Sequence, residues 1–394
     1  MGESYDVVIA GGAVMGSSLA FWLTELAPGK LKILVIERDR SYARSSTALS
    51  VASIRQQFSN PINVRISRFG IDFVRNVKDW LGQDGGVADL GFHEGGYLFL
   101  AGTPTQARAM AEVAEIQRAE GAGTLLLAPE ALAERFPWLD LAGVALGSFG
   151  PRDEGWFDNM GLLGGFRRAA RARGVDYLDD EVTGLVREGD RITAVALASG
   201  RRVACGHAVN ACGTRAAALL RSLGEDLPVE PRKRTVFLID APNAQAPGAP
   251  LLVDHTGFYL RPEGRHWIAA TVPERDGPAD PDDFDPNLDE FEDLVWPRLY
   301  ARAPGFDAVK VIRAWAGHYA YNRLDQNAVL GRWPGTGNLY LMNGFSGHGL
   351  QQAPAVGRGI AELIIHGGYR TLDLSPLGPE RILTGTPFLE RAIV

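Results

Sequence analysis

The sequence predicts an α/β protein with two parts: a discontinuous domain on a parallel sheet, and a second, α+β domain on a mostly antiparallel sheet. First, an apolar strand near the N-terminus runs into a glycine turn and an amphipathic helix, as a parallel βαβ unit does. Second, later strands follow one another through loops instead of crossover helices, which indicates antiparallel pairing. Third, 394 residues exceed the size at which a single core stops growing, so we expect two domains.

The composition is that of a globular protein, with 46% hydrophobic and 22% charged residues. A net charge of −7 gives no reason to expect nucleic acid or an anionic membrane as a partner. No apolar run approaches the roughly 20 residues of a membrane span. The apolar N-terminus contains Asp6 and several glycines, unlike a signal peptide, so we expect a cytoplasmic protein.

Cysteine and histidine usage predicts neither a disulfide nor a metal site. Cys205 and Cys212 are the two cysteines of the chain, and a strand between them would hold them roughly 20 Å apart. His, Cys and carboxylate residues do not cluster at the spacing of metal ligands. We therefore expect no bound metal.

The N-terminal βαβ unit predicts a dinucleotide site. The strand that begins at Tyr5 leads into a glycine turn and a helix at Ser17–Leu26, so free backbone N–H groups and a positive helix end face a phosphate. Ala13 replaces the second glycine of the usual motif, which limits how closely the pyrophosphate approaches. An ordinary tight turn is the alternative. The turn residues that we expect to bind the cofactor are Gly11, Ala13, Val14, Met15 and Gly16.

The second strand, Lys32–Glu37, ends in a carboxylate that can hold ribose hydroxyls. An acid at Glu37 would repel a 2′-phosphate, so NADP is not expected. Arg38 follows it and completes the predicted ribose end of the site. The order of strand, turn, helix, strand and acid makes this domain Rossmann-like.

The remaining pieces of this domain are scattered along the chain. We expect it to comprise residues 1–85, 150–225 and 320–394, with residues 86–149 and 226–319 in the second, substrate domain. Expected helices are Asn63–Trp80, Pro104–Gly121, Leu162–Arg173, Thr214–Leu223 and Leu288–Ala301. Expected strands are Asp176–Leu178, Val182–Glu188, Ile192–Leu197, Arg202–Asn210, Gly91–Ala101, Arg234–Ile239, Gly257–Arg261 and His266–Thr271, and Pro273–Asn287 is expected to be a surface loop.

Four blocks resemble the flavin-dependent oxidoreductases that include D-amino-acid oxidase, sarcosine oxidase and glycine oxidase. These blocks are the glycine turn with Glu37, then Ser45–Ser59, Val209–Gly213 and Asn343–Gly349. Within the family, the chain is most similar to sarcosine-dehydrogenase-like proteins and to the flavoprotein linked to mitochondrial complex I assembly. The resemblance implies FAD as cofactor. It also implies that Val182, Ala211 and Gly213 contact the FAD.

The block Asn343–Gly349 favours FAD over NAD. Its glycines allow a loop to pack against a flat ring, and we expect a helix to begin near Pro354 and to point its positive end at the site. In the family this loop faces the edge of the flavin where negative charge gathers. A glycine turn before a surface helix is the alternative. The residues concerned are Gly344, Ser346, Gly347, His348, Gly349 and Leu350.

Ser45, Ser46 and Thr47 offer hydroxyls to the pyrophosphate or ribityl chain, or merely cap a helix. Relatives that bind flavin covalently use a histidine in this stretch or a cysteine near Trp315–Tyr319. This sequence has no histidine in the first stretch, and Gly317 fills the second position. The resemblance therefore implies non-covalent FAD.

The resemblance also implies how a substrate is held. Arg55 corresponds to the arginine that pairs with a substrate carboxylate, although a structural ion pair is an equal alternative. Gln351 replaces the second anchor, a lysine, and cannot add charge. Tyr259 and Tyr319 are expected to line the substrate pocket, and His318 is a candidate acid or base, each with a plain structural role as the alternative.

We expect the protein to oxidise the C–N bond of a small amino acid or N-methylated amine to an imine, by hydride transfer to FAD. The run Trp267–Thr271 lacks the lysine with which related oxidases activate oxygen, unless Arg261 or Arg265 replaces it. This favours a dehydrogenase with a separate electron acceptor. The alternatives are oxidation of a 2-hydroxy acid with His318 or His255 as base, and a flavoprotein that acts by binding a partner.

Overall fold

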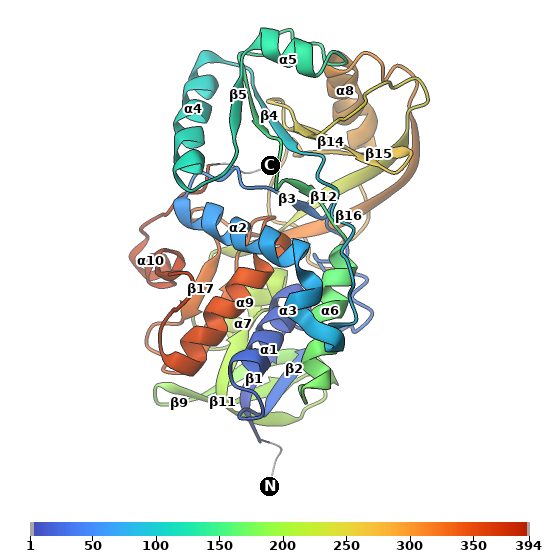
Figure 1. Ribbon diagram of the computed structural model, residues 1–394. Coiled ribbons are helices and arrows are strands. Elements are labelled where there is room, and N and C mark those ends of the chain that lie inside the picture. The colour runs from blue at the N-terminus through green and yellow to red at the C-terminus, as the bar shows by residue number, and fades with distance from the viewer. Residues whose placement is uncertain (1–3, 392–394) are drawn as a thin grey trace.

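The computed structural model describes residues 4–391, which fold around two eight-stranded sheets and one two-stranded sheet. In Figure 1 the parallel sheet and its helices form the lower half of the molecule, and the other large sheet forms the upper half. The small sheet pairs β3 (Ser53–Ile54) with β7 (Gly155–Trp156). The predicted fold class is confirmed.

The lower sheet has the strand order β17-β18-β11-β1-β2-β8, with β10 and β9 attached beyond β11. The pairs β1–β11, β1–β2, β2–β8 and β11–β18 are parallel, as expected for a Rossmann-like sheet. The strands are β1 (Ser4–Ala10), β2 (Ile33–Glu37), β8 (Asp176–Asp179), β9 (Val182–Glu188), β10 (Arg191–Leu197), β11 (Arg202–Asn210), β17 (Val329–Arg332) and β18 (Leu339–Asn343).

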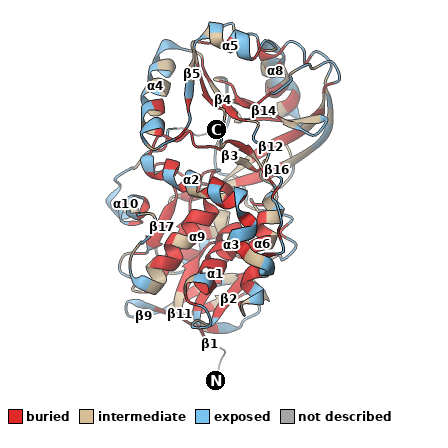
Figure 2. Cartoon of the chain, in the orientation of Figure 1, coloured by how far each residue is buried: buried red, intermediate tan, exposed pale blue. Residues whose placement is uncertain are grey.

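Side chains of β1 alternate between two apolar layers, because successive residues of a strand face opposite sides of the sheet. Val7 and Ile9 pack against the helical layer, whereas Val8 and Ala10 pack against the β9–β10 hairpin and the helix α7. Figure 2 shows α1 and α9 buried along most of their length. The helices of this half are α1 (Val14–Leu26), α2 (Pro61–Arg75), α3 (Val77–Gly85), α6 (Asn159–Ala172), α7 (Ala216–Arg221), α9 (Gly349–His366) and α10 (Glu380–Thr384).

The upper sheet has the order β16-β12-β15-β14-β13-β4-β6-β5. Its pairs are antiparallel apart from β4–β13, so the expectation of a mostly antiparallel sheet is correct. Its strands are β4 (Tyr97–Ala101), β5 (Leu125–Leu127), β6 (Leu146–Gly150), β12 (Val229–Asp240), β13 (Leu251–Val253), β14 (Phe258–Glu263), β15 (His266–Thr271) and β16 (Lys310–Asn322). Its helices are α4 (Pro104–Ala119), α5 (Pro129–Arg135) and α8 (Trp296–Arg302), the last preceded by a π-helical turn at Phe291–Val295.

The division of the chain into two domains at the expected limits stays a prediction. The strands of the lower sheet fall within the three segments assigned to the first domain, although β16 crosses the limit at residue 320. The limits at residues 1 and 394 lie outside the described residues.

Several expected elements differ from the structure, and the helix expected at Leu288–Ala301 is the π-helical turn Phe291–Val295 followed by α8. The helix expected at Asn63–Trp80 is two helices that meet at Asn76, because the Asn76 amide donates to the Asp72 carbonyl and carboxylate and competes with the helical pattern. The strand expected at Gly91–Ala101 begins only at Tyr97.

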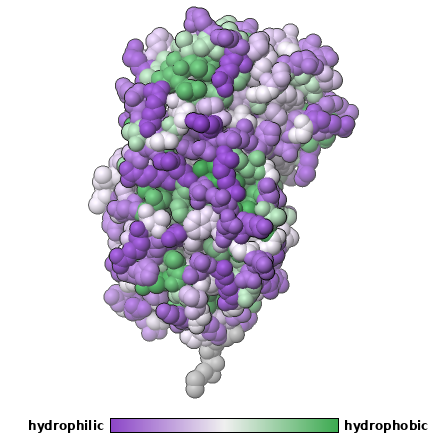
Figure 3. All heavy atoms as spheres, viewed as in Figure 1, coloured by the Kyte–Doolittle hydropathy of each residue, from purple (hydrophilic) through white to green (hydrophobic). Residues whose placement is uncertain are grey.

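On the face drawn in Figure 3, hydrophilic and apolar residues are interspersed over both halves. Among residues 4–391, no helix combines the length and the apolar character that a membrane crossing requires. Within the same residues, no group of three His, Cys, Asp or Glu side chains could hold a metal ion. Cys205 and Cys212 are free thiols.

Candidate active site

A cavity of about 790 Å³ lies between the two large sheets, at the carboxyl ends of β1, β2 and β11. This is the edge at which open α/β sheets bind ligands. Of the predicted site residues, Gly16 and Gly344 lie outside the lining. The lining contains Gly11, Ala13, Val14, Met15, Glu37, Arg38, Ser45, Ser46, Thr47, Arg55, Val182, Ala211, Gly213, Tyr259, His318, Tyr319, Ser346, Gly347, His348, Gly349, Leu350 and Gln351.

The glycine turn brings β1, β11 and α1 into contact. Gly11 has φ of +97°, and a β-carbon there would lie 2.4 Å from the Ala211 carbonyl oxygen. A β-carbon at Gly16 would lie 1.9 Å from the Gly11 carbonyl oxygen, so the helix packs directly on the turn. Ala13 has φ of −67°, which alanine adopts without strain. The replacement of the second glycine is therefore compatible with the turn.

Glu37 is tied to the turn from the end of β2. Its Oε2 accepts from the Gly12 N–H at 2.8 Å, and its Oε1 accepts from the Asp39 N–H at 3.0 Å. Burial raises the pKa of Glu37, while these two hydrogen bonds oppose the shift. Each carboxylate oxygen has a further lone pair, so Glu37 can still accept from the hydroxyls of a ribose.

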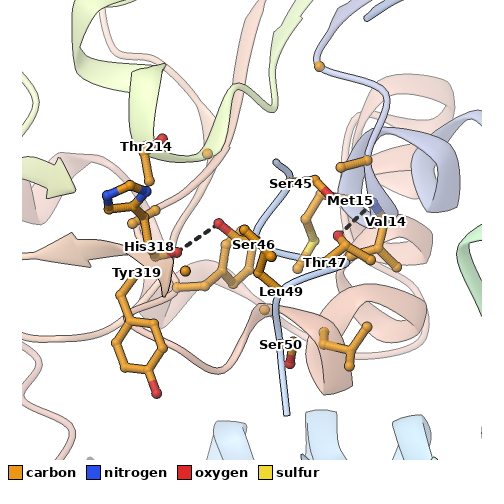
Figure 4. Close-up of a pocket in the computed structure, with 18 of the residues that line it drawn as sticks. Val14, Met15, Ser45, Ser46, Thr47, Leu49, Ser50, Thr214, His318 and Tyr319 are labelled. Atoms are coloured by element: carbon orange, nitrogen blue, oxygen red, sulfur yellow. Dashed lines mark hydrogen bonds between the residues drawn. The ribbon is translucent and has the colours of Figure 1, made fainter. Parts of the chain in front are cut away.

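The hydroxyl-rich loop links the two halves of the molecule. Thr47 Oγ1 accepts from the Val14 N–H at 3.3 Å, and Ser46 Oγ donates to the His318 carbonyl at 2.8 Å (Figure 4). Ser45 Oγ donates to the Tyr42 carbonyl at 2.7 Å. Each hydroxyl is thus engaged within the protein and also lines the cavity. The loop Ser45–Thr47 therefore has a structural role within the protein, and its hydroxyls are also placed where they could contact a pyrophosphate or ribityl chain.

Helix α9 begins at Gly349, so the expectation that it begins near Pro354 is wrong. Proline is favoured in the first turn of a helix, so Pro354 suggested a later start. In the structure Pro354 lies inside α9, where this helix packs against α1. Ser18 Oγ donates to the Ala353 carbonyl at 2.7 Å, and Trp22 Nε1 donates to the Pro354 carbonyl at 2.8 Å. Because the first residues of both helices line the cavity, two positive helix ends face it.

The loop before α9 packs on a tyrosine ring. Gly347 has φ of +95°, and a β-carbon there would lie 2.8 Å from the Tyr319 ring. Ser346 N–H donates to the Ala320 carbonyl at 2.9 Å, and Ser346 Oγ accepts from the Asn322 N–H at 3.0 Å. The loop is therefore fixed against β16, with its glycines toward the cavity. A flat ring fits such a surface.

These features together accommodate a dinucleotide cofactor. The cradle at Gly11 and Gly16 leaves no room for side chains, and the Glu37 carboxylate lines the cavity at the end of β2, next to this cradle. The cavity volume lies in the range of cofactor pockets. The hydrogen-bonding groups that line this cavity, together with its volume, fit FAD.

Arg55 lines the cavity beside Tyr97 of β4 and the start of α9, a region called here the far end, whereas the glycine turn and Glu37 form the near end; Arg55 is 2% exposed. Its Nη1 donates to the Gln57 carbonyl at 2.7 Å, and its Nη2 lies 3.0 Å from His348 Nε2. A guanidinium only donates, so His348 Nε2 accepts and its ring is neutral. Burial and the charge of Arg55 hold the pKa of His348 well below its usual value, which agrees with this assignment. Aromatic rings of Phe58 and Phe99 lie 4.2 and 5.3 Å from the guanidinium.

Gln351 holds the backbone of Arg55. Its Oε1 accepts from the Arg55 N–H at 2.9 Å and from Ser67 Oγ at 3.2 Å. Gly70 on α2 approaches the Gln351 carbonyl so closely that a β-carbon would lie 2.4 Å away. The side chain that replaces the family's lysine thus positions the arginine.

Three tyrosines line the cavity near Arg55, of which Tyr97 and Tyr259 are buried and Tyr319 is partly buried. Burial raises the pKa of each of them, and that of Tyr259 most clearly. They are therefore neutral at physiological pH and able to donate hydrogen bonds. The structure brings Arg55, Gln351, Tyr259 and Tyr319 together.

His318 faces the other side of β16 from Tyr319, as neighbouring residues of a strand do. Its ring points toward Thr214 in Figure 4 and packs edge-on against Phe284, with centroids 4.7 Å apart. Neither ring nitrogen has a hydrogen-bond partner among the described residues. Burial lowers the pKa of His318. The structure therefore does not join His318 to the four residues around Arg55.

Arg234 on β12 is a lining residue that the sequence did not reveal. Its guanidinium makes two hydrogen bonds of 2.7 and 2.9 Å to the carboxylate of Asp276 and lies 5.0 Å from the Tyr319 ring. Arg261, which was expected as an alternative to lysine, instead bonds the Val51 carbonyl and Glu263, outside the lining. The available signal was a charged residue, Arg234, at the start of the otherwise mostly apolar strand expected at Arg234–Ile239.

Comparison with known proteins agrees with this geometry. A family model described as FAD dependent oxidoreductase matches residues 6–363, and the chain belongs to this family. FAD-dependent oxidoreductase domain-containing protein 1 of Bos taurus is 40% identical over 429 residues, which is 100% of this chain and 87% of the relative. Glycine oxidase of Bacillus licheniformis is 23% identical, over 97% of this chain and 98% of its own length.

A crystal structure of L-proline dehydrogenase from P. horikoshii has a TM-score of 0.83 to this chain at 27% identity. The match covers 98% of this chain and 99% of that structure. The expected membership of the flavin family, the FAD cofactor and the relation to amino-acid oxidoreductases are thereby confirmed.

Proposed function

We propose that this protein oxidises the C–N bond of a small amino acid or N-methylated amine that carries a carboxylate. The single observation that carries the proposal is Arg55, a buried guanidinium among tyrosines, at the far end of a cavity whose near end fits FAD. When bound, FAD would supply the acceptor for the hydride from the carbon next to nitrogen, and the resulting imine would hydrolyse in water.

The near end would hold FAD without a covalent bond. The start of α1 would face the pyrophosphate with the Met15 N–H, since the Val14 N–H donates to Thr47 Oγ1, and Glu37 would accept from the ribose. The flavin ring would be faced by the first residues of α9, which begins at Gly349, and by Gly347 in the loop before it. Ala211, Gly213, Val182, Arg38, Leu350 and the hydroxyl loop would complete the site.

The far end would hold the substrate. Arg55 would pair with the carboxylate, because a planar guanidinium offers two parallel donors. Tyr259 and Tyr319 would orient the amine and exclude water, since both are neutral and Tyr259 is buried while Tyr319 is partly buried. A protein base is not required when the lone pair of a neutral amine assists the departure of the hydride. The chemistry would therefore rest on positioning.

Electrons would pass to a separate acceptor more readily than to oxygen. The described part of β15 carries no lysine toward the cavity, and the charge of Arg234 is neutralised by Asp276. A paired guanidinium stabilises superoxide less well than an isolated cation does. Slow reoxidation of the reduced protein in air would support this part of the proposal.

The test is an anaerobic screen that follows the visible band of bound FAD with amines, amino acids and 2-hydroxy acids. Bleaching by an N-methylated amine or amino acid, lost in Arg55→Gln but retained in the surface variant Arg75→Gln, would support the proposal. Bleaching by 2-hydroxy acids alone would favour alcohol oxidation. A band that no compound bleaches would favour a role in binding a partner.

A further inference from the structure

A second buried charge lies behind Arg55. Glu154, between β6 and β7, is 1% exposed. Its Oε1 accepts from the Gln56 N–H at 2.8 Å, and its Oε2 accepts from Gln57 Nε2 at 2.8 Å. Gly150 leaves the space for this carboxyl group, since a β-carbon there would lie 2.2 Å from Glu154 Cδ. The Glu154 carboxylate thus accepts hydrogen bonds from Gln56 and Gln57, the two residues that directly follow Arg55.

The contacts of Gln57 connect the acid to the guanidinium. The Gln57 carbonyl accepts from Arg55 Nη1 at 2.7 Å, while its amide donates to Glu154 and to the Tyr97 carbonyl at 2.9 Å. Gln57 Oε1 accepts from Ser148 Oγ at 2.6 Å. Every polar group of this side chain is therefore engaged, which fixes the distance between the two charges.

The ionisation of Glu154 falls in the physiological range. Burial raises the pKa of Glu154 to about 7, against hydrogen bonds from Gln57 and Gln56 and the charge of Arg55, which lower it. Asp153, at the surface in an ion pair with Arg75, raises it slightly.

Three other titratable groups near Arg55 are Tyr97, Tyr319 and His348. The pKa values of the two tyrosines are raised and that of His348 is lowered well below its usual value, so all three are neutral around pH 7. Of the titratable groups near Arg55, Glu154 is therefore the one whose charge changes around pH 7.

We infer that Glu154 is a positioning residue that sets the effective charge at Arg55, so that the cavity binds a carboxylate more tightly when Glu154 is protonated. This inference rests on the proposed role of Arg55. An ionised Glu154 partly cancels the field of the guanidinium and repels an anionic ligand, and protonation removes both effects. By linkage, binding of a carboxylate must then draw a proton from solvent onto Glu154.

The first measurement uses the FAD-loaded wild-type protein and propionate as a probe, which is fully ionised above about pH 6. The dissociation constant, from the shift of the flavin spectrum, is expected to rise about three- to tenfold between about pH 6 and about pH 8. Propionamide, which has the same shape without the charge, is expected to show no such rise. Calorimetry near neutral pH, in buffers of different ionisation enthalpy, is expected to show proton uptake with propionate alone.

The second measurement compares Glu154→Gln with Asp153→Asn, which removes an exposed charge one residue away. Glu154→Gln is expected to bind propionate with a constant that no longer changes with pH and without proton uptake, whereas Asp153→Asn keeps both properties of the wild type. An unchanged pH dependence in Glu154→Gln, or no proton uptake by the wild type, overturns the inference. The wild-type result stands even if the variant does not fold.

Failure of the proposed role of Arg55 gives a different result. If Arg55→Gln binds propionate as tightly as the wild type at every pH, the carboxylate does not pair with Arg55, and the proposed substrate class is wrong. If Arg55→Gln loses binding while the wild type shows no pH dependence, the role of Arg55 stands and that of Glu154 falls.

Discussion

Gly16→Ala tests the glycine cradle most sharply. The added β-carbon would lie 1.9 Å from the Gly11 carbonyl oxygen and 3.0 Å from Ile9 Cγ2, far inside normal contact. Helix α1 cannot simply tilt away, because Ser18 and Trp22 bond it to carbonyls of α9. We expect a loss of about 3 kcal/mol in the free energy of unfolding, at the upper end for an overpacked core.

Any shift of the turn that relieves this overlap changes the position of the first N–H groups of α1 relative to the pyrophosphate. We expect the dissociation constant of FAD to rise about tenfold or more, which corresponds to about 1.4 kcal/mol. Quenching of FAD fluorescence measures the constant, and urea unfolding measures the stability. Gly123→Ala is the matched control, because a β-carbon there meets nothing within 4 Å. Wild-type FAD affinity and stability in Gly16→Ala would refute the cradle.

Three further predictions concern acidic residues. Glu37→Gln presents an amide donor to one of two backbone N–H groups, so FAD affinity measured by fluorescence quenching should fall about five- to a hundredfold; unchanged affinity contradicts the role of this acid. Asp276→Asn removes the carboxylate that pairs with Arg234 and should speed reoxidation of the reduced protein in air, measured as the return of the flavin band. Asp282→Asn, on the same loop, is the control and should not change the rate of reoxidation. Equal rates in the two variants would argue against an effect of the Arg234 charge.

The third prediction concerns stability. The pKa of Glu154 is about 7 in the folded protein, above the ordinary value of 4.5 expected in the unfolded chain. The contribution of Glu154 to stability is therefore complete below pH 4.5 and is lost as the pH rises through 7. Glu154→Gln should remove about 3 kcal/mol of the fall in unfolding free energy between about pH 5 and about pH 8, and an unchanged fall would contradict the burial of this acid.

Local rules predicted the near end of the site. The turn from Gly11 to Gly16, the strand that ends at Glu37 and the strand that ends before Ala211 each depend on neighbours in sequence, and the structure has them where expected. The strands expected at Val182–Glu188 and Ile192–Leu197 form a hairpin that turns at Gly189, where φ of +62° favours glycine.

The far end could not be predicted in the same way. The partnership of Arg234 with Asp276 joins a strand to a loop far along the chain, and Glu154 reaches Gln56 across 98 positions. No local pattern encodes such contacts, because they form only when segments far apart in the sequence pack together. The start of α9 was missed for a related reason, since packing against α1 keeps Pro354 inside the helix.

The most direct test of the central claim is a single anaerobic turnover with an amine that bleaches the flavin, deuterated at the carbon attached to nitrogen. If hydride leaves that carbon, bleaching slows several-fold in the deuterated compound and an imine or its hydrolysis products accumulate. Bleaching at the same rate with both compounds, in a step shown to be limited by chemistry, would contradict the proposed reaction.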